Sequence, residues 1–189
     1  MGFRIESRHL GEIAVIVPDI YKDERGYFLE TYRADLFREL GLREDFVQDN
    51  QSYSTRGVVR GLHFQWDRPM GKLMRLTFGS AFLVAVDLRK HSPTLGEWFG
   101  IEASSENRRT VWAPAGFARG FCATSEIAVI QYKCTALYNP HGESGIRYDD
   151  PDLDIRWPAM HRYIISQKDL NSSTFGEWMT SPLFEKFAL

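Results

Sequence analysis

The 189-residue sequence lacks several features that define large classes of protein. No apolar run approaches the ~18 residues that a membrane-spanning helix needs, and the polar N-terminus does not resemble a signal peptide. Lys and Arg number 23 against 25 Asp and Glu, so the chain has no basic excess. Dedicated binders of nucleic acid or membrane surfaces carry such an excess. These absences predict a cytoplasmic protein with neither nucleic acid nor membrane as a partner.

Cysteine is scarce as well, since only Cys122 and Cys134 are present. Both lie in apolar segments, and we expect buried free thiols in a reducing compartment. No CxxC, H-x-H or HExxH pattern occurs, and His63 is followed two residues later by Gln65 instead of a second histidine. The sequence therefore predicts no metal site. The glycine-rich motifs of nucleotide cofactors and the GxSxG serine motif are absent too, so we expect no cofactor.

Many short apolar segments separated by Gly, Pro and Asp predict a mainly β fold, a jelly-roll barrel or sandwich with a few short peripheral helices. Strands are expected over 13–17, 27–31, 46–51, 57–65, 72–78, 80–89, 98–103, 110–113, 120–124 and 127–135. Gly79, between two of these strands, predicts a tight hairpin. A helix is expected over 33–40, capped by Thr31 and ended by Gly41.

No linker or repeat divides the chain, so we expect one domain over 1–189. Its core would span about 10–140, and a tail over 158–189 would pack outside. The segment 81–86, AFLVAV, is apolar on both faces of its predicted strand, and both faces must be covered. A dimer that pairs sheets and a covered monomer both satisfy this requirement.

The stretch 60–75, RGLHFQWDRPMGKLMR, is the most informative chemically, because it places Arg60, His63 and Lys72 in two predicted strands. A histidine with a pKa near 6.5 beside fixed cations suits removal of a proton next to a carbonyl of an anionic substrate. Asp169 is our candidate for the carboxylate that orients it. The alternative is a core histidine that donates to a backbone carbonyl.

Two further side chains have alternative interpretations. Alternation along 127–134 places Tyr132 on one face with Ala128 and Ile130, either as a core tyrosine or as a general acid opposite His63. Lys72 points toward an apolar interior, which is costly unless the ammonium meets an anion such as an enolate oxygen. The alternative for Lys72 is a strand-end lysine that reaches solvent.

Arg60 and Arg25 are fork-shaped donors suited to a diphosphate, with surface salt bridges as the alternative. Strict alternation, however, places Arg60 and His63 on opposite faces of their strand. Both residues line one site only if Gly61 lies at a bulge or the strand twists there.

Nine ordered segments extend this pattern along nearly the whole chain. They are DERGYFLET (23–31), FVQDNQS (46–52), RGLHFQ (60–65), GKLMR (71–75), VAVDLRKHSPTLGEW (84–98), WAPAGFARGF (112–121), YKCT (132–135), DDPDLDIRWP (149–158) and SQKD (166–169). In these segments the chain resembles the dTDP-4-dehydrorhamnose 3,5-epimerases of sugar-nucleotide pathways. The resemblance implies a cupin-type jelly roll that dimerises through shared strands and uses neither metal nor cofactor.

By the same resemblance, the substrate is dTDP-4-dehydro-6-deoxy-D-glucose, whose C4 ketone acidifies the protons at C3 and C5, and the product is dTDP-4-dehydro-L-rhamnose. His63 matches the base, Asp169 its partner, Tyr132 the acid on the other face and Lys72 the enolate stabiliser. Tyr138 matches a residue that stacks on thymine. The substrate-binding positions are Arg25, Glu30, Gln48, Asn50, Arg60, Arg119, Tyr138, Glu143 and Lys168.

Arg119 departs from the family pattern, which commonly has histidine at this position. Arginine keeps a permanent charge and does not shuttle protons near neutral pH. A C3-only epimerase acting on a related 4-keto-6-deoxy sugar nucleotide is therefore the alternative function. Acid–base residues argue against a non-catalytic sugar-nucleotide binder, and the missing second histidine argues against a metal-dependent cupin oxygenase.

Overall fold

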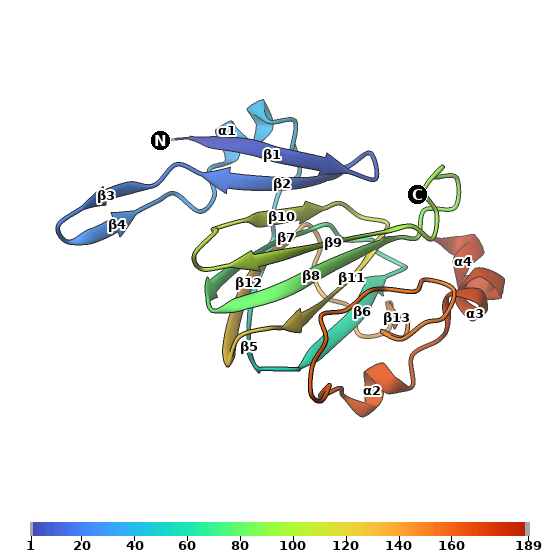
Figure 1. Cartoon of the computed structure of the whole chain (residues 1–189). Coiled ribbons are helices and arrows are strands. Elements are labelled where there is room, and N and C mark those ends of the chain that lie inside the picture. Colours follow the sequence, from blue (N-terminus) through green and yellow to red (C-terminus); the bar gives the residue numbers. More distant parts are fainter. Residues whose placement is uncertain (1, 188–189) are drawn as a thin grey trace.

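Two β-sheets face each other across an apolar interior in the computed structural model, which describes residues 2–187 (Figure 1). The six-stranded sheet runs in the order β1 (Phe3–His9), β2 (Ile13–Pro18), β10 (Thr110–Ala113), β7 (Lys72–Phe78), β12 (Ile127–Cys134) and β5 (Gln48–Thr55). The five-stranded sheet runs in the order β13 (Glu143–Gly145), β6 (Val59–Gln65), β11 (Phe117–Ala123), β8 (Ser80–Asp87) and β9 (Trp98–Ser104). The expected mainly β class is confirmed, and the sheets do not close into a barrel.

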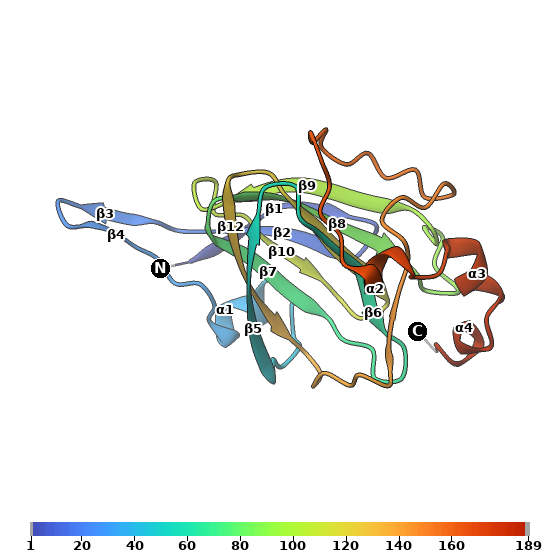
Figure 2. The same ribbon diagram turned by 90° about the horizontal axis from the view of Figure 1, so that it is seen from below.

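Smaller elements surround the two sheets. A hairpin of β3 (Tyr21–Asp23) and β4 (Gly26–Phe28) projects away from the body in both views (Figures 1 and 2). Helix α1 (Ala34–Glu39) lies near the N-terminal strands, and α2 (Gln167–Leu170), α3 (Phe175–Thr180) and α4 (Pro182–Lys186) belong to the C-terminal segment. None of these helices is long and apolar enough to cross a membrane.

The expected hairpin at Gly79 is wrong. Gly79 connects β7 of one sheet to β8 of the other, so it forms a corner between the two layers. Its φ is +71°, and a Cβ there would lie 1.9 Å from the carbonyl oxygen of Ile127. Glycine permits either a hairpin turn or a corner between sheets. The local sequence does not show which of the two forms, because the strands pair with partners elsewhere in the chain.

The expected helix is confirmed over Ala34–Glu39, but its capping by Thr31 is wrong. The helix begins two residues later than a Thr31 cap requires, so Arg33 occupies the N-cap position, where its guanidinium has no acceptor atom for a capping hydrogen bond. Gly41, at φ +86°, follows the C-cap as predicted. Strand β1 was not predicted, since its partly buried residues alternate with charged ones at the edge of the sheet.

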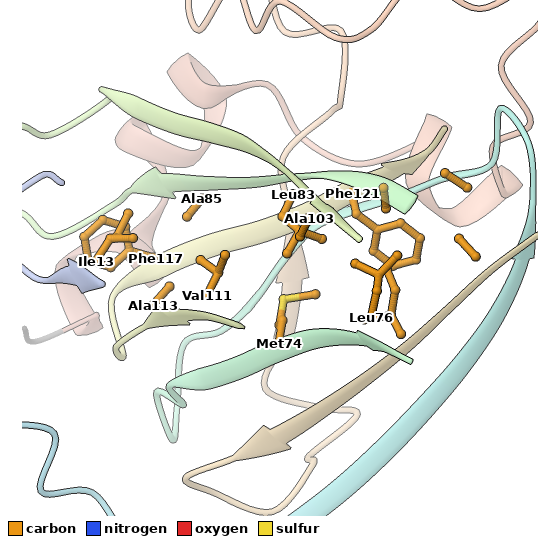
Figure 3. Close-up of a cluster of buried hydrophobic side chains, with 14 residues drawn as sticks. Ile13, Met74, Leu76, Leu83, Ala85, Ala103, Val111, Ala113, Phe117 and Phe121 are labelled. Carbon is orange, nitrogen blue, oxygen red and sulfur yellow. The ribbon is translucent and has the colours of Figure 1, made fainter. Parts of the chain in front are cut away.

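The main core fills the space between the two sheets (Figure 3). Leu83 and Ala85 of β8 face Met74 of β7 and Val111 of β10 there, and Phe117 and Phe121 of β11 contribute the largest side chains of this cluster. Both cysteines are buried free thiols, as expected. This core fixes the distance between the sheets and thereby the walls of the cavity described below.

The outer face of β8 is covered by the chain's own C-terminal helices. Val84 and Val86 pack in a second apolar cluster with Trp178 of α3 and with Phe184 and Phe187 at α4. These three aromatic rings pack edge to face, with centroids about 6 Å apart, a favourable arrangement for aromatic pairs. The apolar segment 81–86 is thus covered on both faces within one chain, as the covered-monomer alternative requires.

Candidate active site

A bulge in β6 brings Arg60 and His63 to the same cavity. On β11, Phe121 pairs with Arg60 and Arg119 pairs with His63, so three residue steps on β6 oppose two on β11. Gly61 lies in the bulge with φ +115°, and a Cβ there would come within 2.6 Å of the Arg119 carbonyl oxygen and of the Gly120 Cα. The predicted irregularity at Gly61 is therefore confirmed, and only glycine fits there.

His63 and Asp169 form a hydrogen-bonded pair. The Nε2 atom of His63 lies 2.7 Å from Oδ1 of Asp169, which sits in α2, 106 residues away in the sequence. Because a carboxylate only accepts, Nε2 carries the hydrogen and Nδ1 is left as the basic nitrogen. The Asp169 side chain is buried, and its Oδ2 accepts from the backbone N–H of Gly61.

The local sequence accounts for the position and the charge of Asp169. The Oγ atom of Ser166, the N-cap of α2, accepts from the backbone N–H of Asp169 and so fixes the turn that carries the carboxylate. Burial alone raises the pKa of Asp169, but the hydrogen bond with His63 and the N–H of Gly61 outweigh it, and the pKa lies below its ordinary value. Asp169 is therefore ionised near neutral pH and orients the imidazole.

Lys72 and Tyr132 reach the cavity from the opposite sheet. The Nζ atom of Lys72 lies 5.3 Å from the centre of the Tyr132 ring, and both side chains line a cavity of about 290 Å³ together with His63. Burial, followed by the nearby Arg119 charge, lowers the pKa of Lys72 to about 8. Burial also raises the pKa of Tyr132, so its hydroxyl keeps its proton at neutral pH. Basic and acidic groups thus face each other across one space.

Polar residues of β5, of β13 and of the loop at Tyr138 line an adjoining compartment of about 200 Å³, together with His63, Lys72 and Tyr132. The hydroxyl of Tyr138 donates to Oε2 of Glu143 at 3.0 Å, and Lys168 binds the same carboxylate. Gln48 accepts from the backbone N–H of Tyr138 at 2.9 Å and donates to Asn50 at 3.2 Å. These five predicted binding residues are therefore linked in one hydrogen-bonded chain.

Gln65 is a positioning residue that sequence reasoning did not identify. Its side chain is buried, and its amide nitrogen donates to the carbonyl oxygens of Arg68 and Leu137 at 2.7 and 3.3 Å. Its amide oxygen accepts from the backbone N–H of Asn139 at 2.8 Å. Gln65 thereby holds the loop that carries Tyr138. The signal in the sequence was its place at the end of β6, two residues after His63.

Cys134 and Ser52 were also missed as parts of the cavity wall. Each follows a predicted site residue by two positions on its strand, Cys134 after Tyr132 and Ser52 after Asn50, so strand alternation alone would have found them.

The remaining predicted residues differ in placement. Arg60 lines the larger compartment, where its guanidinium donates to Ser54 Oγ and to the Tyr53 carbonyl. Arg25 lies on the projecting β3–β4 hairpin with its side chain 85% exposed, and it pairs with Asp23. Glu30 lies 3.6 Å from Arg33. Neither Arg25 nor Glu30 lines the two compartments within this chain.

Comparison with known proteins matches most of the chain to one family. Residues 7–177 match the family model described as dTDP-4-dehydrorhamnose 3,5-epimerase. A dTDP-4-dehydrorhamnose 3,5-epimerase of Methanothermobacter thermautotrophicus is 53% identical over 171 residues, which cover 89% of this chain and 92% of the relative. A dTDP-4-dehydrorhamnose 3-epimerase of Streptomyces niveus is 38% identical over 176 residues, covering 92% and 84%.

Among solved structures, the Legionella pneumophila dTDP-6-deoxy-D-glucose-3,5-epimerase in complex with dTDP-4-keto-L-rhamnose superposes with a TM-score of 0.90. It is 44% identical, and the match covers 92% of this chain and 93% of the other.

Two facing sheets enclose a cavity lined by a paired imidazole, a lysine and a protonated phenol, and the relatives place this β-sandwich protein among the isomerases. No group of three or more His, Cys, Asp or Glu side chains within residues 2–187 is arranged to hold a metal ion. The family match and the close relatives make the identity specific, and the chain belongs to the dTDP-4-dehydrorhamnose 3,5-epimerase family.

Proposed function

We propose that this protein epimerises dTDP-4-dehydro-6-deoxy-D-glucose at C3 and C5 to give dTDP-4-dehydro-L-rhamnose, without a cofactor. The observation that carries the proposal is the His63–Asp169 pair in one wall of a cavity whose opposite wall holds Lys72 and Tyr132. Inversion at carbon requires a base on one face of the sugar and an acid on the other, and the two sheets supply one each.

In this proposal, Nδ1 of His63 takes the proton from the carbon next to the C4 ketone, and the electron pair of that C–H bond moves into an enolate. The Lys72 ammonium stabilises the negative oxygen as it develops, a contribution of the oxyanion-hole type. Tyr132 then returns a proton to the carbon from the opposite face. The buried Asp169 carboxylate stabilises the imidazolium while it exists.

We propose that the nucleotide of the substrate binds in the adjoining compartment. Tyr138 offers an aromatic face with half of its surface exposed, and Lys168 and Arg60 supply cations near the two compartments. Stacking of a base on such a ring contributes about 1–3 kcal/mol in single-strand binders. The chain of hydrogen bonds from Gln48 to Glu143 fixes the ring before the ligand arrives.

Incubation with dTDP-4-dehydro-6-deoxyglucose in heavy water, followed by proton NMR, tests this function. The expected result is deuterium at both C3 and C5 together with the L-lyxo product. Label at C3 alone supports the second candidate, a C3-only epimerase, which is favoured by Arg119 and by the 3-epimerase among the relatives. Absence of label at both carbons contradicts both candidates.

We also propose a cytoplasmic homodimer, in which the β3–β4 hairpin of one subunit reaches the partner's cavity. The hairpin projects from the body, leaves Tyr21, Tyr27 and Phe28 exposed, and carries Arg25 away from the cavity of its own chain (Figure 2). Light scattering after size-exclusion chromatography should give twice the mass of one 21.8-kDa chain. A monomer mass at working concentration contradicts this arrangement.

A further inference from the structure

Arg119 is a buried cation that has no carboxylate partner within residues 2–187. Its side chain is 4% exposed, and three backbone carbonyl oxygens bind its guanidinium. Nη1 donates to the Ala113 and Pro114 oxygens at 3.3 and 2.9 Å, and Nη2 donates to the Met70 oxygen at 2.6 Å. Neutral carbonyls satisfy these donors without cancelling the charge, so the cavity contains an uncompensated positive charge.

The three carbonyls that bind Arg119 belong to the backbone on both sides of Lys72. Met70 precedes Lys72 by two residues in the segment that leads into β7, and Ala113 is the residue that pairs with Lys72 across the β10–β7 ladder. The guanidinium therefore holds the backbone before Lys72 and the backbone beside it. Movement of either segment would displace the Lys72 ammonium relative to the cavity.

Most of the guanidinium is bound by the protein itself. Three of its N–H groups bind carbonyls, and Nε is shielded from solvent without a hydrogen-bond partner in the described chain. Arg119 lines the larger compartment beside Lys72 and is the ladder partner of His63. This position lets Arg119 act on chemistry in the cavity through Lys72 and His63.

We propose that Arg119 is a positioning residue that acts through Lys72. Its guanidinium fixes the backbone on both sides of Lys72, and its permanent charge opposes a second positive charge in the same compartment. This inference rests on the proposed function only in assigning Lys72 to the enolate oxygen; the coupling between the two cations is a property of the free protein.

The surroundings of Lys72 support the coupling. Burial and then Arg119 lower the pKa of Lys72 to about 8, whereas Cys134 and Glu143 oppose the shift. Tyr132, whose ring lies beneath the ammonium, keeps its proton in this pH range.

From β6, Arg60 and His63 face the same space, and His63 forms an ion pair with Asp169 of α2 when it is protonated. Burial lowers the pKa of Arg119 itself only to about 10, so it stays charged while Lys72 titrates.

Trace acetylation of the native protein with acetic anhydride between about pH 6 and 11, read by peptide mass spectrometry, measures the titration of Lys72 without substrate. Exposed Lys22 in the same samples is the internal reference. In the wild type we expect half-maximal reactivity of Lys72 near pH 8. Reactivity of Lys72 that follows Lys22 across the whole range overturns the inference.

Arg119→Gln removes the charge and keeps an amide donor for the carbonyls. We expect it to raise the half-maximal pH of Lys72 by roughly one unit, a common effect of one nearby charge. Arg60→Gln is the matched control, because it removes a cation from the same compartment that is not bound beside Lys72. An unchanged titration in Arg119→Gln, or an equal shift in Arg60→Gln, contradicts the proposal.

Arg119→His is the second variant, for the case in which Arg119→Gln does not fold. A histidine with a pKa near 6.5 is neutral where Lys72 titrates, so the same upward shift is expected. In a turnover assay, the loss of activity above about pH 8 should move to higher pH in both variants. A protein without epimerase activity refutes the proposed function, whereas an active protein with an unmoved titration refutes only the role of Arg119.

Discussion

The two ends of the space between the sheets have opposite character, although the same strands build both. On two strands, one face carries an apolar side chain in the packed core and a chemical group at the cavity. The pairs are Leu76 and Lys72 on β7 and Ile130 and Tyr132 on β12; on β11, Arg119 lies between Phe117 and Phe121 of the same core cluster. Strand alternation assigns a residue to a face, but its position along that face decides whether it stabilises the fold or meets a ligand.

The apolar side chains strengthen the electrostatic interactions of the polar groups in the cavity. Closely packed side chains such as Phe121 and Met74 exclude water from one side of the cavity, and the ammonium of Lys72 therefore loses part of its hydration. A charge in such a place interacts more strongly with a developing oxyanion than it would in water. Substitutions at the polar end should therefore change turnover more than stability, and those at the apolar end should do the opposite.

The largest loss of turnover in this series is expected for Asp169→Asn. An amide does not hold the imidazole in the tautomer that leaves Nδ1 basic, and we expect a loss of about 10²–10⁴-fold. Steady-state turnover measures this, with Asp149→Asn, a change in an exposed ion pair with Arg147, as control. An equal loss in the control would contradict the assignment.

The stability of the same variant has a pH signature. Because the folded pKa of Asp169 is depressed, its carboxylate stabilises the wild type above the unfolded pKa of about 3.9 and loses this effect as the pH falls through the lower folded value. Urea unfolding of Asp169→Asn should lack that part of the acid destabilisation.

Lys72→Met should mainly lower turnover, whereas Leu76→Ala, on the same face of β7, should mainly lower stability. Loss of the ammonium should lower turnover by about 10²–10³-fold, the size of one oxyanion donor. It should also raise stability at pH 7 by on the order of 1–3 kcal/mol, since the folded state no longer buries a charge. Below pH 8 the buried charge of Lys72 destabilises the folded wild type in full. This destabilisation disappears as the pH rises from about 8, the folded pKa of Lys72, toward its ordinary value of 10.5.

Leu76→Ala should instead cost about 2–5 kcal/mol of unfolding free energy. Its turnover below the melting range should stay within about twofold, because Leu76 lies in the packed core and away from the two compartments. Urea denaturation and turnover of both variants measure the contrast. Equal effects of the two changes on turnover would contradict a functional division along β7.

Tyr132→Phe should separate two halves of the reaction. Removal of the hydroxyl leaves the His63 side intact, so exchange of substrate protons with solvent should persist better than net inversion. We expect inversion to fall by about 10²-fold, at the lower end for one acid–base group. Deuterium wash-in and product formation, followed in one NMR time course, measure both rates. A parallel fall of the two rates assigns Tyr132 another role.

Gly61→Ala should have the smallest effect on turnover among the site variants, about tenfold or more, together with a loss of stability of about 1–3 kcal/mol. The added methyl meets the Arg119 carbonyl and Gly120 at 2.6 Å and disturbs the bulge. Gly11→Ala is the matched control, because Gly11 also has positive φ, at +78°, but has open space around it. Equal losses in both variants would make backbone strain, and not the bulge, the cause.

Much of the fold followed from the sequence, since 72–78 and 110–113 were predicted with the observed bounds. A bulge or a twist at Gly61 was predicted as well, because two site residues with the wrong spacing required one of them, and the structure has the bulge. Gly79 was misjudged because strand pairing is a long-range property that a local turn signal does not encode.

The site was less accessible to reasoning from the residues alone. The contact between His63 and Asp169 joins positions 106 residues apart, and no local pattern predicts such a contact. The carbonyl anchors of Arg119 come from two separate loops, so its sequence position suggested a ligand-binding cation and not its hydrogen bonds. Strand periodicity likewise did not predict that Arg25 lies on a projecting hairpin.

In the proposed reaction, His63, held by Asp169, removes the proton next to the C4 ketone. The most direct test compares the wild type with His63→Ala in heavy water, with dTDP-4-dehydro-6-deoxyglucose as substrate and circular dichroism as the check of folding. We expect deuterium at C3 and C5 with the wild type and a rate at least about 10²-fold lower with the folded variant. Wild-type rates of labelling in His63→Ala would contradict this role of His63.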